Sequence, residues 1–426
     1  MRRLVYRSQE YQAFMASVNE DLELLSKQVN EIGEQVKSQG DEALVGLAAR
    51  FDGARLGVKD LRITESEMDE AYQKVDAEYL DALRVAIDNI RLFHQRQLKT
   101  GWVEPDINGN LLGQMQRPLE RVGIYVPGGT AAYPSSVLMN AIPAQVAGVK
   151  EIVMVTPPAA DGRINPYTLV AAGELGLKEI YKTGGAQAVF ALAFGTDTIA
   201  PVDKITGPGN IYVTLAKKMV YGQVDIDMLA GPSEILIIAD ETANPAWVAA
   251  DMMSQAEHDR RARSVLVTAD KELLNQVEKE LYDQVQSLSR RDIIEEALDT
   301  RGAFVLVDSM SEAFKVANEV APEHLELMIK EPFSWLGSVE NAGAVFIGSY
   351  TPEPVGDYIA GPNHILPTGG TARFYSPVTV DTFMKKSSLI YYSQTGFQQH
   401  CDQIIKLAEV EGLTAHANSA RIRKGL

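Results

Sequence analysis

The sequence has few of the residue types that most often carry metal and redox chemistry, cysteine and histidine. A single cysteine, Cys401, stands among 426 residues. One cysteine excludes an intramolecular disulfide and any zinc site built from several cysteines, so we expect a reducing compartment, the cytoplasm. Imidazole is the side chain best suited to bind transition metals and to move protons near neutral pH. With only six histidines, each one can be weighed individually.

Long apolar runs and an excess of positive charge are also missing. No apolar stretch is long enough to span a bilayer, and Arg7 and Glu10 interrupt the N-terminus before a signal-peptide core forms. Acidic side chains number 57 against 40 lysines and arginines, which gives a formal net charge of -17. Nucleic acids and anionic membranes attract basic proteins, so we expect neither as a partner. A small substrate, cationic rather than anionic, fits this charge better.

The length and composition predict a globular protein of more than one domain. Of the 426 residues, 46% are hydrophobic and 23% are charged, which is enough to bury a large core. The first hundred or so residues have the apolar spacing of helices. From Arg121, short β-rich runs alternate with helical stretches; they are RVGIYVP, EIVMVTPP, EIYKTGG and KITGPG, then SEILIIAD, RSVLVTAD, AFVLVDS and AVFIGS. This alternation predicts two domains built from parallel βαβ units.

Turns suited to ligand binding follow three of the predicted strands, and parallel α/β sheets bind ligands at the carboxyl ends of strands. RVGIYVP runs into Gly128-Gly129-Thr130, EIYKTGG into Ala186-Gln187, and KITGPG into Asn210. Free N–H groups in such turns can hold the phosphates of a dinucleotide. None matches the G-x-G-x-x-G pattern, since GPGNIY ends in Tyr212, and ordinary βα turns explain them equally well.

A candidate metal site begins in the stretch SQAEH. Asn244-Pro245 is typical of a helix start, and the helix would carry Gln255 and His258, three residues apart, on one face. By themselves these two residues are explained equally well by a solvated helix end. Asp357, in a Gly/Pro-rich loop after AVFIGS, and His416, in EGLTAH, would complete the set. An amide, a carboxylate and two imidazoles suit Zn²⁺ or Mn²⁺.

The segment APEHLEL contains a candidate acid/base pair. We interpret Ala321-Pro322-Glu323-His324 as a helix start, whose positive end would favour the neutral imidazole that accepts a proton. His324 is therefore a candidate general base, and Glu323 could activate a water. Glutamate in a first helical turn is also common for electrostatic reasons alone. His364, in PNHILPTGG, is either a further polar contact or, as we prefer, a loop histidine bonded to the backbone.

Cys401 suggests a competing chemistry, the oxidation of an aldehyde through a covalent thiohemiacetal. That reaction needs a reactive thiolate in a strained or electropositive site. The surrounding QQHCDQIIKL is helical and carries no such feature, so we expect a cysteine that simply packs in a helix.

Eight sequence blocks, in order, resemble the histidinol dehydrogenase family, and the resemblance covers nearly the whole chain. The blocks are GIYVPGGTAAYPSSVLMNAIPA, GGAQAVFALAFGT, KITGPGN, DMLAGPSEILIIAD, SQAEH, APEHLE, GDYIAGPNHILPT and EGLTAH. The resemblance implies a zinc-dependent enzyme of histidine biosynthesis that oxidises L-histidinol to L-histidine through L-histidinal and reduces two NAD⁺. It also implies one Zn²⁺ per subunit and a homodimer with a shared active site, in which Glu411 and His416 come from the partner.

The resemblance also assigns site residues, motif by motif. The zinc ligands that it implies are Gln255, His258, Asp357 and His416. The implied acid/base pair is Glu323 and His324. The implied contacts to the nicotinamide dinucleotide are Tyr125, Gln187 and Asn210. The implied substrate contacts are Ser233, Gln255, His258, His324, Asp357, Glu411 and His416.

The fold class that follows is α/β, with two incomplete Rossmann-like domains of parallel sheet and helical segments at both ends. Incomplete domains of this kind account for the missing G-x-G-x-x-G. We expect an N-terminal helical arm over 1–24 and a C-terminal helical tail, exchanged between subunits, over 381–426. The first Rossmann-like domain, with the zinc and acid/base residues, is expected over 25–120 and 233–380, and the second, with the NAD contacts, over 121–232.

Two other functions are weighed against this one. A relative on the same scaffold would be an NAD- and zinc-dependent dehydrogenase of another small alcohol, such as a sulfonated diol; Ser233, Glu411 and His416 argue for histidinol instead. A non-catalytic ligand-binding paralogue would be expected to lose Glu323 or His324, and both are present.

Overall fold

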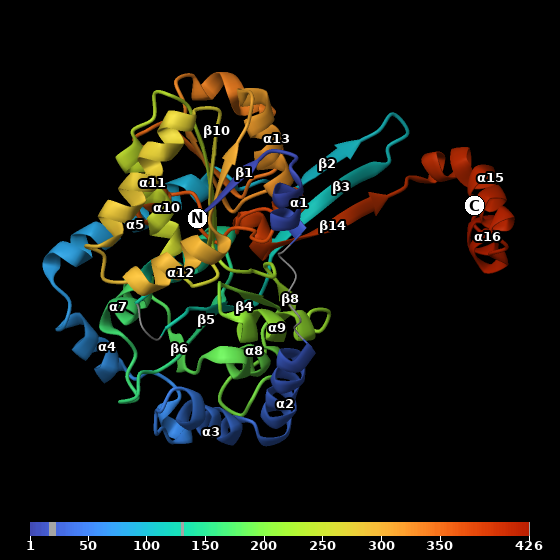
Figure 1. Ribbon diagram of the computed structural model, residues 1–426. Helices are drawn as coiled ribbons and strands as arrows, with labels where there is room; N and C mark the ends of the chain where they lie inside the picture. The colour runs from blue at the N-terminus through green and yellow to red at the C-terminus, as the bar shows by residue number, and fades with distance from the viewer. Residues whose placement is uncertain (17–22, 129–131, 426) are drawn as a thin grey trace. The chain divides into compact units, whose positions relative to one another are not determined.

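The computed structural model describes residues 1–16, 23–128 and 132–425, which form two compact units (Figure 1). Unit 1 comprises Met1–Gln97 and Leu119–Phe383, and unit 2 comprises Leu98–Pro118 and Met384–Leu426. Among the described residues, no helix combines the length and the apolarity that a bilayer crossing requires. The domain boundaries expected from the sequence stay predictions.

The first sheet of unit 1 has six strands within the described ranges, all parallel, in the order β1-β11-β10-β9-β12-β13. These strands are β1 (Arg2–Val5), β9 (Glu234–Ala239), β10 (Arg263–Thr268), β11 (Ala303–Leu306), β12 (His324–Met328) and β13 (Ala344–Ile347). The helices of this part are α1 (Gln9–Ala16), α10 (Pro245–Ala256), α11 (Lys271–Val285), α12 (Arg291–Arg301), α13 (Met310–Val320) and α14 (Glu353–Tyr358).

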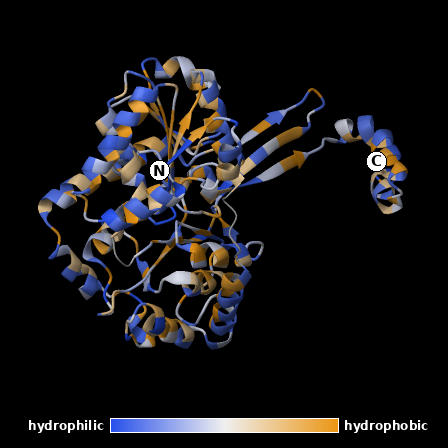
Figure 2. Ribbon diagram, viewed as in Figure 1, coloured by the Kyte–Doolittle hydropathy of each residue, from blue (hydrophilic) through white to orange (hydrophobic). Residues whose placement is uncertain are grey.

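Helices cover both faces of this sheet, which explains why its central strands are apolar at nearly every position. In β9, Ile235 and Ile237 pack with α10, α11 and α12, whereas Leu236 and Ile238 pack with α1 and α13. All six residues of β9 are buried, as expected for a parallel strand between two helical layers. Figure 2 shows hydrophobic colour along these strands. The prediction of parallel βαβ units is confirmed here.

In the described part of the chain, the second sheet of unit 1 has five parallel strands, in the order β6-β5-β4-β7-β8. They are β4 (Arg121–Tyr125), β5 (Glu151–Thr156), β6 (Glu179–Lys182), β7 (Lys204–Thr206) and β8 (Asp225–Ile226). The helices of this part are α2 (Glu23–Gln39), α3 (Asp41–Phe51), α4 (Glu65–Tyr72), α5 (Ala77–Gln95), α6 (Pro134–Ala147), α7 (Pro166–Glu174), α8 (Gly185–Phe194) and α9 (Ile211–Val220). Short 3-10 helices are η1 (Val58–Asp60), η2 (Pro332–Ser338), η3 (Thr371–Arg373) and η4 (Val380–Phe383).

Unit 2 is an antiparallel sheet followed by two helices. Its strands, in the order β14-β3-β2, are β2 (Trp102–Pro105), β3 (Leu111–Pro118) and β14 (Met384–Tyr391). Its helices are α15 (Gln394–Val410) and α16 (Thr414–Arg421). Cys401 lies buried in α15, and its thiol contacts the Ala420 carbonyl in α16 at 3.6 Å. The prediction of a packed helix cysteine is confirmed.

Six strands of the described ranges were not predicted from the sequence; they are β1, β2, β3, β8, β12 and β14. The reason is clearest for three of them. β1 has a single buried residue, Leu4, and exists through its pairing with β11. β14, read from the sequence as part of a helical tail, has no buried position, so its sequence lacks the alternation of a half-buried strand. The third, β12, begins where Ala321-Pro322-Glu323-His324 was interpreted as a helix start, and that interpretation is wrong. Helix α13 ends at the left-handed Ala321, and a strand begins at His324.

A buried ion pair stabilises the loop after β7. The Lys217 ammonium, on α9, pairs with the Asp227 carboxylate, and these side chains are only 3% and 1% exposed. Lys217 also donates to the Gly207 carbonyl at 2.9 Å, while Asp227 accepts from the Gly207 N–H at 2.7 Å. Gly207 has φ +116°, and a Cβ there would lie 2.1 Å from the Tyr125 carbonyl oxygen. The pair therefore clamps a loop that only glycine can form.

We expect Lys217→Met to destabilise the protein by about 3 kcal/mol, because it leaves the Asp227 carboxylate buried without its cation. The measurement is the free energy of unfolding from denaturant titration. The control is Lys218→Met, one residue further along α9 and exposed, which should stay within about 0.5 kcal/mol of the unsubstituted protein. Equal stabilities for the two variants would contradict the prediction.

Candidate active site and metal centre

Unit 1 contains a cavity of about 350 Å³ that is lined by residues from both of its sheets. From the second sheet come Tyr125, at the end of β4, and Asn210, just after β7. These two lie at carboxyl ends of strands, as expected for a parallel sheet. The first sheet contributes Ser233 and His324, at the amino ends of β9 and β12. The sequence analysis expected binding residues at the carboxyl ends of strands, so these two residues lie at the opposite ends.

His324 is held in the tautomer that can accept a proton at the cavity. Its ring is 3% exposed, and Nδ1 lies 2.9 Å from the carbonyl oxygen of Glu234. A carbonyl oxygen only accepts, so Nδ1 carries the proton and donates it. Nε2 is buried and has no hydrogen-bond partner among the described residues. Burial lowers the pKa of the His324 imidazole. The neutral base inferred from the sequence is thus supported, although burial rather than a helix end produces it.

Glu323 precedes His324 and is fixed by the same neighbouring strand. Its Oε2 accepts the N–H of Glu234 at 2.9 Å and lies 3.7 Å from His324 Nδ1. Burial raises the pKa of the Glu323 carboxyl well above its usual range. A neutral carboxyl group at this position can donate a proton as well as accept one.

Gln255 brings an amide oxygen to the cavity from the last turn of α10. Asn244 caps this helix by accepting the Ala246 N–H, and Pro245 occupies the first turn, as predicted. Gln255 is 1% exposed and its Oε1 has no partner among the described residues. The helix ends at Ala256, so His258 lies in the turn beyond it and is exposed, but it lines the same cavity.

Short helix α14 brings two carboxyl groups to the site, one turn apart. His324, Glu353 and Asp357 each offer a ligand atom, and these atoms lie within 4.8 Å of one another. Burial, followed by the charge of Glu353, raises the pKa of Asp357 to about 9. Nitrogen and oxygen donors at this spacing suit a divalent transition metal. We did not single out Glu353 in the sequence, where it resembles an ordinary first-turn glutamate; its spacing of four from Asp357 was the available signal.

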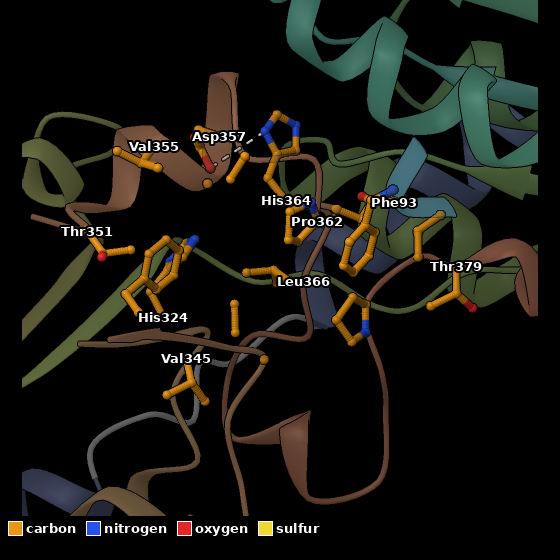
Figure 3. A pocket seen from close by; sticks show the side chains of 18 of the residues that line it. Phe93, His324, Val345, Thr351, Val355, Asp357, Pro362, His364, Leu366 and Thr379 are labelled. Atoms are coloured by element: carbon orange, nitrogen blue, oxygen red, sulfur yellow. Dashed lines mark ion pairs between the residues drawn. The ribbon is translucent and has the colours of Figure 1, made fainter. Parts of the chain in front are cut away.

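His364 lines this cavity and a neighbouring, more apolar one of about 360 Å³, which also receives His324 and Asp357 (Figure 3). His364 Nδ1 lies 3.6 Å from Asp357 Oδ1. We preferred a loop histidine bonded to the backbone. The structure agrees with both alternatives, because His364 makes a hydrogen bond to the backbone of Asp357 and also lines the two cavities.

Two of the three residues expected to contact a dinucleotide, Tyr125 and Gln187, lie at the turn after β6, whereas Asn210 follows β7. The Tyr125 hydroxyl accepts the Gly185 N–H at 3.0 Å, and Gln187 is buried two residues further along α8. Asn210 caps α9 by accepting the N–H groups of Tyr212 and Val213. Of the turn Gly128-Gly129-Thr130, the last two residues lie outside the described ranges.

Glu411 and His416 belong to unit 2. They line a surface hollow of about 640 Å³ between α15 and α16, and both are exposed. Described by unit, the predicted residues therefore fall into two groups. Unit 1 gathers Ser233, Gln255, His258, Glu323, His324 and Asp357 around one cavity, and unit 2 carries Glu411 and His416.

Comparisons with known proteins find the same family along nearly the full length of the chain. Residues 16–424 match the family model described as histidinol dehydrogenase. The chain is 58% identical over 423 residues to the histidinol dehydrogenase of Heliobacterium mobile, covering 99% of each. It is 52% identical over 408 residues to that of Bacillus subtilis strain 168, covering 96% of this chain and 95% of the relative. The crystal structure of histidinol dehydrogenase from Elizabethkingia anophelis matches with TM-score 0.93 and 40% identity, covering 99% and 98% of the two chains.

The buried His364 predicts how the stability of the metal-free protein depends on pH. Burial, followed by the charge of His324, lowers the pKa of His364 from 6.5 to about 4. Between these values the unfolded chain binds a proton that the folded chain does not, so stability falls as pH falls through this window. Between pH 7.5 and pH 5, we expect the free energy of unfolding to fall by about 2 kcal/mol less in His364→Gln than in the unsubstituted protein. Denaturant titrations of both proteins with a chelator present measure this, and parallel losses would contradict it.

Proposed function

The chain belongs to the histidinol dehydrogenase family, and from this premise we propose that it oxidises L-histidinol to L-histidine through L-histidinal, with two NAD⁺ and one zinc ion. The reaction ends histidine biosynthesis. The observation that carries the proposal is the neutral His324, whose unpartnered Nε2 lies at a cavity with the buried amide oxygen of Gln255 and the carboxyl group of Asp357. A general base beside a set of metal donors is what oxidation of an amino alcohol held by a metal requires.

The cavity offers nitrogen and oxygen donors that suit zinc, although the His, Asp and Glu atoms that lie within 4.8 Å of one another belong to His324, Glu353 and Asp357, a set that shares only Asp357 with the predicted ligands. Gln255 Oε1, His258 and Asp357 would hold it, and His416 from a second copy of the chain would be the fourth ligand. Gln255 supports this because its oxygen is buried without a hydrogen-bond partner among the described residues, which is costly unless a cation compensates. Zinc held there would supply a Lewis acid that orients an amino alcohol in the cavity.

The protein's own groups account for the proton transfers of the first oxidation. His324 Nε2 takes the proton of the substrate hydroxyl while the hydride leaves the same carbon. The nicotinamide of NAD⁺, which accepts the hydride, would lie on the side of Tyr125, Gln187 and Asn210. The hydrogen bond from Nδ1 to the Glu234 carbonyl holds the ring while its charge changes.

The second oxidation needs water, and Glu323 is placed to assist. Water adds to the carbonyl carbon of L-histidinal, and the protonated Glu323 carboxyl donates a hydrogen bond to the carbonyl oxygen as negative charge develops there. His324 releases the first proton to solvent before the second oxidation. The hydrate then loses a hydroxyl proton to His324 and a hydride to a second NAD⁺, which leaves the carboxyl group of L-histidine. Ser233, Asp357 and Glu411 would complete the substrate contacts, with Glu411 facing the substrate's cationic groups.

We further propose a homodimer that shares its active sites and works in the cytoplasm. Unit 2 exposes large apolar side chains, among them Leu407, Val410 and Ile390, which are 68%, 73% and 75% exposed. Exposed apolar side chains in such number are typical of a protein contact surface. Sharing would make activity depend on dimerisation, because each site would take Glu411 and His416 from the other subunit. Neither alternative, another small-alcohol dehydrogenase or a non-catalytic paralogue, is favoured by the family match.

The stoichiometry of the reaction tests the proposed function. We expect two NADH for each L-histidinol consumed, because the aldehyde stays bound between the two oxidations. A strong chelator should abolish turnover, and added Zn²⁺ should restore it. NADH absorbance and histidine analysis provide the measurement; one NADH per substrate, with aldehyde released, would indicate a simple alcohol dehydrogenase instead.

Substitution of His324 tests its role as the base. We expect His324→Ala to lower kcat by roughly two to four orders of magnitude, the usual size of a general-base contribution, while zinc content stays normal. His416→Ala is the contrasting variant, which should lower zinc content and raise KM. Steady-state kinetics and metal analysis on both proteins measure this. Loss of zinc from His324→Ala, or normal zinc in His416→Ala, would refute the respective role.

A further inference from the structure

Gln255 presents a problem of orientation that the other donors of the site do not. The two ends of its amide have nearly the same shape, but only the oxygen can bind a cation, since the NH₂ group is a donor. A flip about the last side-chain bond would turn the NH₂ toward the cavity. Something in the protein must therefore select one orientation of the amide.

The contact that selects the orientation is made by Glu353. Gln255 Nε2 donates to Glu353 Oε1 at 3.3 Å, and both side chains are buried. In the flipped amide, two oxygen atoms would face each other at this distance, without water between them to reduce the repulsion. The observed orientation leaves Gln255 Oε1 without a partner among the described residues, at the wall of the cavity.

Glu353 is itself held from three further directions, one of which is a side-chain hydrogen bond with Asp357. Its Oε2 accepts the hydroxyl of Ser254 at 3.0 Å, and Ser254 is the neighbour of Gln255 in α10. Its backbone N–H donates to Glu326 Oε1, on β12, at 3.0 Å. Helix α14, which begins at Glu353, is thereby tied to α10 and to the strand that starts with His324. Asp357 lies four residues further along the same helix.

We propose that Glu353 is a positioning residue, which fixes the Gln255 amide with its oxygen toward the cavity and so raises the affinity of the site for zinc. The inference rests on the proposed function, because it takes the zinc site as given. It goes beyond that function in naming the group that makes an amide a dependable ligand. A carboxylate that orients a metal ligand commonly accounts for a 10- to 100-fold difference in affinity.

A second role for Glu353 would be direct ligation, since it shares the 4.8 Å cluster with His324 and Asp357. The two roles differ in how they combine with Gln255. A positioning residue acts only through Gln255, so its removal should have no effect once Gln255 is gone. A direct ligand would act independently, and the two losses would multiply.

The experiment measures the dissociation constant of Zn²⁺ for the metal-free, full-length protein by competition with a chromophoric chelator, which does not depend on activity. The variants are Glu353→Met, Glu353→Gln, Gln255→Ala and the double variant Gln255→Ala/Glu353→Met. We expect Glu353→Met to weaken binding by roughly 10- to 100-fold. Glu353→Gln should restore most of the affinity, because its amide oxygen still accepts from Gln255 Nε2. The double variant should bind no more weakly than Gln255→Ala alone.

Ser254→Ala is the matched control, because it removes a hydrogen bond to the other oxygen of Glu353 and leaves the contact to Gln255 intact; near-normal affinity is expected. Thermal unfolding of the metal-free proteins shows whether Glu353→Met is folded. If it is not, Glu353→Asp, which withdraws the carboxylate from Gln255 by one methylene, takes its place with the same expectation. Normal affinity in Glu353→Met, no recovery in Glu353→Gln, or multiplied losses in the double variant would overturn the inference. Normal affinity in Gln255→Ala would instead overturn the proposed zinc site.

Discussion

The candidate site depends on carboxyl groups that are buried on and around strand β12. Glu323, Glu326 and Asp357 all have a raised pKa, and burial is the largest cause in each. A buried carboxylate is costly unless hydrogen bonds or a cation compensate it. The backbone N–H groups of Glu234 and Glu353 supply part of that compensation. A divalent cation at the cavity would supply much of the rest, so the same burial that tunes the acid/base pair also favours a metal.

The two sheets of unit 1 contribute different chemistry to one cavity. The second sheet presents turns and helix starts, with Tyr125 and Asn210 at carboxyl strand ends, an arrangement suited to a nucleotide. The first sheet presents its amino strand ends, where His324 can bond to the carbonyl of Glu234 on the adjacent strand. Under the proposed function, the oxidant must meet the carbinol carbon while the base meets its hydroxyl group, and a cavity lined by both sheets would allow this.

Much of the scaffold was predictable because its signals are local. The strands of both parallel sheets appeared as short apolar runs, apart from β1, β8 and β12, and Asn244-Pro245 marked the start of α10. β12 was misread because Pro322 and Glu323 are typical of a first helical turn, and only its pairing between β9 and β13 makes this segment a strand. Glu353 was missed for a similar reason, since its importance lies in a contact with Gln255, 98 positions away.

By itself, the sequence determined the α/β class, the residue types available for chemistry and, through its motifs, the family. Each of these depends on composition, periodicity or spacing along the chain. Only the tertiary structure decided which nitrogen of His324 is free, which way the Gln255 amide points, and that burial holds His324 neutral. Tautomer, amide orientation and pKa depend on the few ångströms around a side chain, and those neighbours come from segments far apart in the sequence.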